Sequence, residues 1–433
     1  MKNKLKAIIT LILTASLLTS TFTGCSSLKK DIKSKNDTKI LTFVTANHPW
    51  LDSIIPLLPE FEAQYDVKVE IQTTIEDYLT AKLTVPLTGE FETPDVFMYR
   101  PLQEGRDFVE KGLVEPLDKY VKDDKEYDFE DFSKGSIGSA TIDNKLVGIP
   151  IVTEQEILYY RKDLLANAGL TVPKTIEELK ADAQKLNNPE NGVYGFIARG
   201  ESSALVTQLS SYIYSEGGDF IKDNKAVLNT PEGIKAIENY GLLLKNYAPK
   251  EVRKWSWTQA MDLFSKGKAA LYTDASSLYK NALDQNTSQI IDKIGYAKFP
   301  SGDAGSNPYN VTAWLLGINP YSENKDLAWK FIRWATSKEI VLKTQQEGNQ
   351  GARMSVWNSS QGTLSFPKEL SDVIKESSEG GVDHDRPTVI NIGDAREAVG
   401  STVQAVLNGQ DVKDAVQKAN DTLQNIIDKE KNK

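Results

Sequence analysis

The sequence predicts an α/β fold in a chain long enough for two domains, and three observations support this prediction. The 433 residues are 40% hydrophobic, with ordinary amounts of glycine, proline and aromatic residues, as in globular proteins. Short apolar or alternating runs, which indicate strands, recur along the chain. Segments with apolar residues at helical spacing lie between them, and this alternation is typical of a parallel sheet covered by helices on both faces.

The first elements of the expected fold follow this alternation. Residues 40–45 predict a strand, and the helix after it is expected to begin at Pro49. The alternating run 67–71 indicates a second strand, which is followed by a helix at 78–87. Residues 95–99 then predict a short strand after a Thr-Pro turn.

The middle of the chain repeats the pattern with clear local signals. The box Thr175–Glu178 is typical of a helix start in which both side chains satisfy backbone groups. Residues 194–198 predict a strand and residues 204–215 a helix. Farther on, Thr230 and the proline after it predict the start of another helix.

The first 24 residues are expected to be a signal peptide rather than part of the fold. Three lysines precede the apolar run 7–18, which is too short to span a membrane as a helix. The segment Phe22–Cys25 resembles a lipobox, and the chain's single cysteine has no internal disulfide partner. We therefore expect Cys25 to be lipidated, with an uncleaved anchor as the alternative. The polar, lysine-rich stretch 26–38 is expected to be a flexible tether.

A polar corner follows a buried strand near the middle of the chain. A helical pattern ends at Gly267, and the apolar run 269–272 comes directly after it. Two tryptophans, Trp255 and Trp257, lie nearby in the sequence. Asp274 then stands at the carboxyl end of this strand, which is where ligands bind in open α/β sheets. We interpret Asp274 and Trp257 as ligand-binding residues, although an ordinary helix–strand corner remains the alternative.

Other polar and aromatic residues also follow predicted strands. His48 and Trp50 come after the first strand, Arg100 after the strand at 95–99, and Arg199 after the strand at 194–198. Flat aromatic faces and fixed polar groups suit sugars and polyols, and the guanidinium fork suits vicinal hydroxyls. The alternative is that Trp50 packs as the first residue of its helix and that His48 is solvated.

Three segments carry a resemblance to a known family: Gly112–Leu117, the run Tyr160–Leu164, and Phe264–Ala270 with the pattern Phe-x-x-Gly-Lys-Ala-Ala. They resemble family 1 extracellular solute-binding proteins, the sugar-capturing subunits of bacterial ABC importers. The resemblance implies a two-lobed, periplasmic-binding-protein-like fold of type II, with crossings between the lobes near Glu154, Ala270 and Leu316. The expected parts are a signal peptide (1–24), a lipid-anchored tether (25–38), lobe 1 (39–153 and 271–316) and lobe 2 (154–270 and 317–433).

The resemblance also implies roles for residues near the crossings. Glu154 lies where members of the family carry a sugar-contacting acid, and Trp314 lies where an aromatic ring covers the ligand. The loop that ends at Arg353 could present its guanidinium as a further contact. Glu154 as a surface acid and Trp314 as a core residue are the alternatives. Asp383 and Asp385 lack the spacing of a calcium loop, which indicates a solvated loop.

Composition narrows the remaining function classes. The formal charge of -9, which becomes -12 once the three leader lysines are removed, disfavours nucleic acid as a partner. Two histidines and one cysteine do not make a zinc cluster, and no cofactor is expected. Neither a phosphate loop ending in Gly-Lys-Ser or Gly-Lys-Thr nor a Gly-x-Ser-x-Gly elbow occurs.

We expect a monomeric bacterial lipoprotein on the extracellular face of the cell membrane. It would capture a small sugar, polyol or oligosaccharide by hinge closure and deliver it to the permease subunits of an ABC importer. A secreted glycoside-acting enzyme and a surface adhesion protein without a small ligand remain the alternatives. Paired carboxylates for glycoside hydrolysis are compatible with a chain that contains 60 acidic residues.

Overall fold

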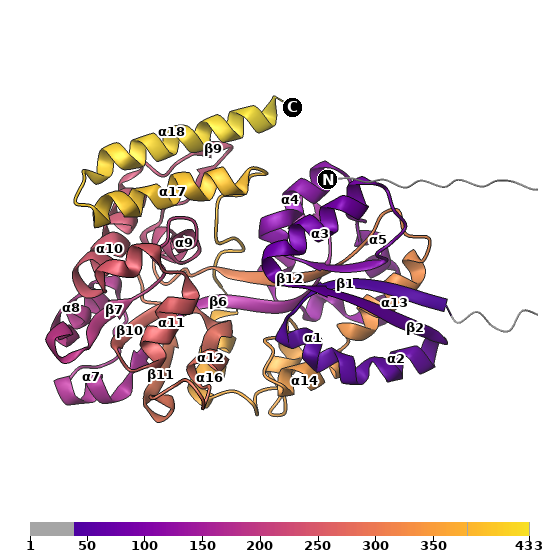
Figure 1. Ribbon diagram of the computed structural model, residues 1–433, viewed down its shortest axis with the longest axis horizontal. Coiled ribbons are helices and arrows are strands. Elements are labelled where there is room, and N and C mark those ends of the chain that lie inside the picture. The colour runs from indigo at the N-terminus through magenta and orange to yellow at the C-terminus, as the bar shows by residue number, and fades with distance from the viewer. Residues whose placement is uncertain (1–38, 379, 433) are drawn as a thin grey trace, which may run out of the picture. The chain divides into compact units, whose positions relative to one another are not determined.

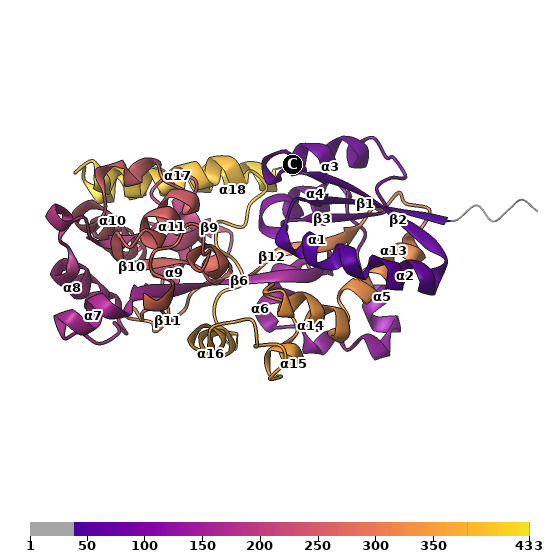
Figure 2. The ribbon, with the colours of Figure 1, turned by 60° about the horizontal axis from the view of Figure 1, so that its bottom comes forward.

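One long strand, β6 (Ile149–Arg161), joins the two halves of the main sheet (Figure 1; Figure 2). The computed structural model of the protein describes residues 39–378 and 380–432. The first half of β6 pairs with β12 (Asn310–Ile318), and its second half pairs with β10 (Ala269–Ala275) and β11 (Ile294–Lys298). Each half of β6 therefore belongs to a different lobe. The expected signal peptide, tether and Cys25 lie outside the described residues.

The first lobe contains the sheet β2-β1-β3-β12-β6. Strand β1 (Lys39–Ala46) runs parallel to β2 (Val67–Thr74) and β3 (Val96–Tyr99), whereas β12 runs antiparallel to β3 and β6. Its buried core comes from residues 41–152 and 314–352. The helices of this lobe are α1 (Pro49–Ile54), α2 (Leu58–Tyr65), α3 (Glu76–Thr88), α4 (Arg106–Glu110), α5 (Asp118–Asp123), α6 (Lys134–Ser139), α13 (Lys325–Ala335) and α14 (Lys338–Gln346).

The second lobe is built on β11, the second half of β6, β10 and β7 (Tyr194–Ile197). Its buried core comes from residues 157–299 and 357–427. The helices of this part are α7 (Lys162–Ala168), α8 (Ile176–Leu186), α9 (Leu205–Glu216), α10 (Pro231–Tyr247), α11 (Trp257–Ser265), α12 (Tyr279–Ala282), α15 (Met354–Trp357), α16 (Lys368–Ser377), α17 (Ile392–Leu407) and α18 (Val412–Lys431). Two short hairpins complete the described strands, β4 (Thr141–Ile142) with β5 (Lys145–Leu146) and β8 (Ile221–Lys222) with β9 (Lys225–Ala226).

Local sequence signals account for several element boundaries. The Thr175 side chain accepts a hydrogen bond from the backbone N–H of Glu178 (3.1 Å), and the Glu178 carboxylate accepts one from the N–H of Lys174 (2.6 Å). The expected helix start is therefore present, with the reciprocal bond one residue earlier than in a standard capping box. Helix α11 stops before Gly267, whose φ of 75° is the left-handed conformation that glycine adopts without strain.

The structure differs from the expected lobe boundaries after Ala270. Strand β10 is buried along its whole length and lies between β6 and β7 in the second sheet, so the chain does not cross there. The second core continues to Phe299, and the first core resumes only at Trp314. Segment 314–352, expected mostly in lobe 2, is thus part of lobe 1, because β12 pairs with β3 and β6.

The three crossings of the described chain can be placed between the two cores. They lie between Val152 and Ile157, between Phe299 and Trp314, and between Ala352 and Trp357. The crossing expected near Glu154 is present, and the one expected near Leu316 lies slightly earlier on the same strand. Within the described ranges, every helix is too short or too polar to traverse a lipid bilayer.

Candidate functional site

A cleft of about 580 Å³ is lined by residues of both lobes. His48 reaches it from the turn after β1, and Arg100 from the turn after β3. Both turns are at the carboxyl ends of parallel strands, where the edge of the sheet leaves side chains free of strand pairing. The second lobe contributes Arg199, which follows β7, and Trp257, the first residue of α11.

Trp314 forms an aromatic part of the cleft wall. The register between β12 and β6 shifts on both sides of this residue, so that it sits at a β-bulge. Its ring packs against His48, with centroids 5.5 Å apart, and the Arg100 guanidinium lies 5.7 Å from its ring centre. Trp314 lines the cleft although it is only 5% exposed, and its contact with a ligand stays a prediction.

His48 and Arg100 are both held by neighbours in the first lobe. The backbone N–H of Trp50 donates to His48 Nδ1 (3.0 Å). Burial, aided by the charge of Lys280, lowers the pKa of His48 to about 4, so its neutral ring carries the proton on Nε2. Burial lowers the pKa of Arg100, but ion pairs with Glu104 and Glu76 raise it more, so the net pKa is above its ordinary value. The cleft therefore receives donors in fixed positions.

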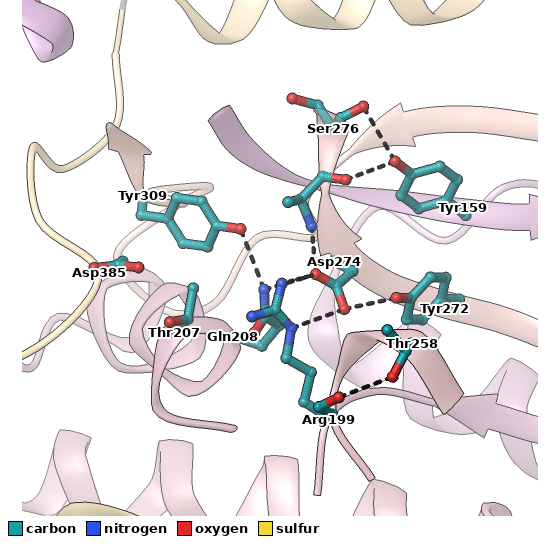
Figure 3. A network of polar contacts seen from close by, with 12 residues as sticks. Tyr159, Arg199, Thr207, Gln208, Thr258, Tyr272, Asp274, Ser276, Tyr309 and Asp385 are labelled. Atoms are coloured by element: carbon teal, nitrogen blue, oxygen red, sulfur yellow. Dashed lines mark hydrogen bonds and ion pairs between the residues drawn. The ribbon is translucent and has the colours of Figure 1, made fainter. Parts of the chain in front are cut away.

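Arg199 is positioned by a buried network centred on Asp274 (Figure 3). Asp274 accepts hydrogen bonds from Arg199 Nη2 (2.6 Å) and Nε (3.1 Å), and it is 0% exposed. It also accepts from the Tyr272 hydroxyl (2.6 Å) and from Gln208 Nε2 (3.0 Å). Gln208 in turn donates to the Tyr309 hydroxyl (3.2 Å). We expected Asp274 to contact the ligand directly, but it is buried behind Arg199 and holds that side chain in place.

Strand register explains why Arg199 meets Asp274. Tyr272 on β10 lies opposite Ile197 on the parallel strand β7. Asp274 comes two positions after Tyr272, and Arg199 comes two positions after Ile197. The two charged residues therefore lie together at the same edge of the sheet.

Glu154 lines the cleft beside this network. Burial is the main cause that raises the pKa of Glu154 to about 7. The positive charge of Arg199 lowers this pKa, but the negative charges of Asp385 and Asp274 raise it again. At neutral pH its carboxyl group is thus present in both protonation states. It can accept hydrogen bonds from ligand hydroxyls when ionised and donate one when protonated.

Two further candidates lie outside the cleft. Trp50 is 1% exposed and packs edge-on against Phe43, with centroids 6.4 Å apart, in the first core. Trp50 is the second residue of α1 and belongs to the buried face of that helix. The structure therefore favours the alternative in which Trp50 packs in the core. Arg353 is also 1% exposed and donates to the carbonyls of Thr336 (2.6 Å) and Tyr127 (2.9 Å). It ties the third crossing to the first lobe instead of facing the cleft.

The carboxyl-terminal part of the chain supplies cleft residues that we did not predict. Asp385, expected in a solvated loop, is 3% exposed and pairs with Arg386 at 2.5 Å. Burial opposes its charge, but Arg386 lowers the pKa of Asp385 to about 2. Arg396 on α17 lines the same wall. The sequence shows a cluster of aspartates in this loop, but no local pattern indicates that the loop folds into the cleft.

The described residues contain no group of three or more His, Cys, Asp or Glu side chains that could hold a metal ion. The cleft is lined by hydrogen-bonding and aromatic groups, and these suit the recognition of a polar organic molecule.

Residues 48–341 match the family of bacterial extracellular solute-binding proteins, and the chain belongs to this family. It is 28% identical to a mannitol-binding protein of Pseudomonas aeruginosa, over 71% of this chain and 71% of the relative. It is 26% identical to an erythritol/L-threitol-binding protein of Mycolicibacterium smegmatis, over 70% and 67% of the two chains.

Solved structures show the same two-lobed fold. An ABC transporter solute-binding protein from Agrobacterium radiobacter K84, in complex with ribitol, matches with a TM-score of 0.77 and 27% identity, covering 90% of this chain and 99% of that one. A solute-binding protein from Agrobacterium vitis S4, with bound D-mannitol, matches with a TM-score of 0.71 and 26% identity, covering 91% and 98%. The expected type II fold and the resemblance to solute-binding proteins are thus confirmed.

Proposed function

We propose that the protein captures a carbohydrate or polyol in this cleft and delivers it to the permease of an ABC importer. The observation that carries the proposal is the composition of the cleft, which joins an aromatic face at Trp314 to fixed donors at Arg100 and Arg199. Sugars and polyols need apolar faces for their C–H groups and directed partners for their hydroxyls. The ligands named for the mannitol-binding relative and the ribitol-bound neighbour support this ligand class.

Hinge closure is the proposed mechanism of capture. The first lobe presents Trp314 and Arg100, the second presents Arg199, and Glu154 lies on a crossing between them, so a bound ligand touches both lobes. Only the closed form lets the ligand make all of these contacts, and the difference in binding free energy shifts the population toward closure. The three crossings are the segments in which backbone rotation would occur. Small-angle scattering should show a smaller radius of gyration with ligand, and an unchanged profile at saturation would indicate a rigid receptor.

The expected location and partners complete the proposal. Lipidation of Cys25 would hold a monomer at the extracellular face of the membrane, and the tether after it would let the lobes reach a permease. The closed form would dock on the transmembrane subunits of that permease.

We also propose that the ligand is bound without chemical conversion. The family and the relatives named above are binding proteins of transporters. Incubation with ribitol, mannitol and short oligosaccharides, followed by chromatography, should return the ligands intact. Release of products at a rate that scales with protein concentration would favour the glycoside-acting alternative.

Calorimetric titration against erythritol, ribitol, mannitol and maltotriose tests the function directly. At least one should bind, and Trp314→Ala should weaken that binding by about tenfold or more, which corresponds to about 1.4 kcal/mol. Trp334→Ala is the matched control, because Trp334 packs on Phe61 (5.3 Å between centroids), away from the residues that line the cleft. Equal losses in the two variants, or no binding of any carbohydrate by the parent protein, would contradict the proposal.

A further inference from the structure

The second-lobe wall of the cleft carries arginines in excess of their carboxylate partners. Arg199 pairs with Asp274 at 2.6 Å, and Arg386 pairs with Asp385 at 2.5 Å. Each of these two ion pairs has a net charge close to zero. Arg396, which lines the same wall from α17, forms no ion pair with any described residue.

The contacts of Arg396 leave part of its guanidinium available to a ligand. Nε donates to the carbonyl of Ser203 (2.8 Å), and Nη2 lies 3.4 Å from the Thr207 hydroxyl. No hydrogen bond to a described residue uses Nη1. A guanidinium presents five N–H donors in a planar fork, so an open edge remains that matches a carboxylate in geometry.

Its surroundings are unfavourable for an isolated cation. Burial and the neighbouring charge of Arg386 lower the pKa of Arg396 to about 9, despite the opposing effect of Asp385. Asp385 is already engaged by both Nε and Nη2 of Arg386. Asp385 therefore lies near two arginines and pairs with only one of them. The other carboxylate near Arg396, that of Glu201, accepts hydrogen bonds from the backbone N–H groups of Ser203 and Ala204.

The other groups of this wall do not supply the missing charge. Lys280 also lines the cleft, donates to the backbone carbonyl of Glu347 and forms no ion pair with a described residue. It is exposed as a residue, although partial burial lowers its pKa against the opposing charge of Glu347. Glu154 has a raised pKa and is ionised only in part at neutral pH. Arg100 on the opposite wall is matched by Glu104 and Glu76.

We propose that the ligand is an acidic carbohydrate, an aldonic or uronic acid, whose carboxylate binds the open edge of Arg396. The proposal rests on the proposed carbohydrate-binding function and specifies the ligand class of the same cleft. A neutral polyol would cover Arg396 and leave a buried cation without a counter-charge, which is costly in a water-excluded site. A carboxylate removes that cost with one negative charge, whereas a dianion would meet stronger repulsion from Asp385 and Glu154.

Matched ligand pairs provide the test. Ribonate is compared with ribitol, mannonate with mannitol, and galacturonate with galactose by calorimetric titration of the unmodified protein at pH 7.5. In at least one pair the acid should bind more than tenfold tighter than the neutral compound. Its affinity should fall as salt rises from 50 to 500 mM, while binding of the neutral partner changes little.

Two variants locate the effect. Arg396→Gln should remove most of the preference for the acid, because the acid loses its counter-charge and the neutral partner no longer covers an unpaired cation. Lys413→Gln, at an exposed position of α18 that does not line the cleft, removes the same charge and should keep the preference. Should Arg396→Gln fail to fold, Arg396→Lys retains the cation and should bind the acid more weakly but still prefer it.

The outcomes separate the two proposals. A neutral compound that binds as tightly as its acid in every pair overturns the acidic-ligand inference and leaves the carbohydrate-binding function standing. A preference for the acid that survives in Arg396→Gln also overturns the assignment of Arg396. Failure of every neutral and acidic carbohydrate to bind overturns the proposed function itself.

Discussion

Replacing Asp274 by asparagine should weaken both the fold and the ligand site, because the carboxylate is the centre of the network in Figure 3. Asp274 accepts five hydrogen bonds, from Arg199 (two), Tyr272, Gln208 and the backbone N–H of Ala275. Asparagine keeps the shape but loses the charge, and its amide turns one acceptor into a donor that faces other donors.

The structure sets the magnitude of this effect. Arg199 is 13% exposed in its side chain and Asp274 is 0% exposed, so the variant leaves a cation nearly buried without its partner. Breaking one side of such a buried pair costs about 3–5 kcal/mol. We expect the free energy of unfolding to fall by about 3 kcal/mol or more. Affinity should fall by about tenfold, since Arg199 stays in the cleft but is no longer held by two bonds.

Urea unfolding and calorimetric titration on the same preparation measure both quantities. Asp262→Asn is the matched control, because Asp262 is 56% exposed and, among the described residues, its one ion pair is with Lys266 at the end of α11. Such exposed pairs contribute about 0–1 kcal/mol, so the control should differ little from the parent protein. A double-mutant cycle with Arg199→Gln should show a coupling energy above about 1 kcal/mol.

One result would refute this reasoning. If Asp274→Asn unfolds like the parent protein but loses a hundredfold in affinity, the carboxylate contacts the ligand directly and the buried network does not describe the bound state. Zero coupling with Arg199→Gln would likewise remove the positioning role.

Two further outcomes are expected. Cys25→Ser should move the protein from the membrane fraction to the soluble fraction, whereas full-length protein that stays with membranes would indicate an uncleaved anchor. Glu154→Gln should flatten the pH dependence of unfolding between about pH 4.5 and 7. Because burial raises the folded-state pKa of Glu154 to about 7, the folded form binds the proton more tightly, and the associated stability is present below pH 4.5 and lost as pH rises through 7. Urea midpoints at several pH values compare the two proteins, and parallel curves would show that Glu154 titrates normally.

Much of the first lobe's cleft wall could be predicted from sequence because strand ends are local features. His48 and Arg100 directly follow recognisable strands, and the carboxyl ends of parallel strands form one edge of a sheet whatever the rest of the fold does. Arg199 was located by the same logic. The turn at Gly267 was also predictable, since a helix that ends in a left-handed residue favours glycine.

Pairing between distant strands decided which lobe each later segment joins. The run 269–275 does not indicate whether the chain passes to the other lobe at this point, because a buried apolar strand has the same sequence pattern in either sheet. Its position between β6 and β7 became clear only from the register. The same register separated Asp274, which is covered by its neighbours, from Arg199, which remains at the cleft.

The sequence alone thus determined the α/β class, the family resemblance and the strand-end residues that line the cleft, because these depend on local periodicity and on short motifs. Tertiary structure alone decided that Trp50 is buried while Trp314 faces the cleft, since side-chain exposure depends on what packs over it. It also brought Asp385 and Arg396 to Arg199, nearly two hundred residues earlier in the chain. The charge balance of the cleft depends on the tertiary structure, because the fold decides which carboxylates come close enough to an arginine to form an ion pair.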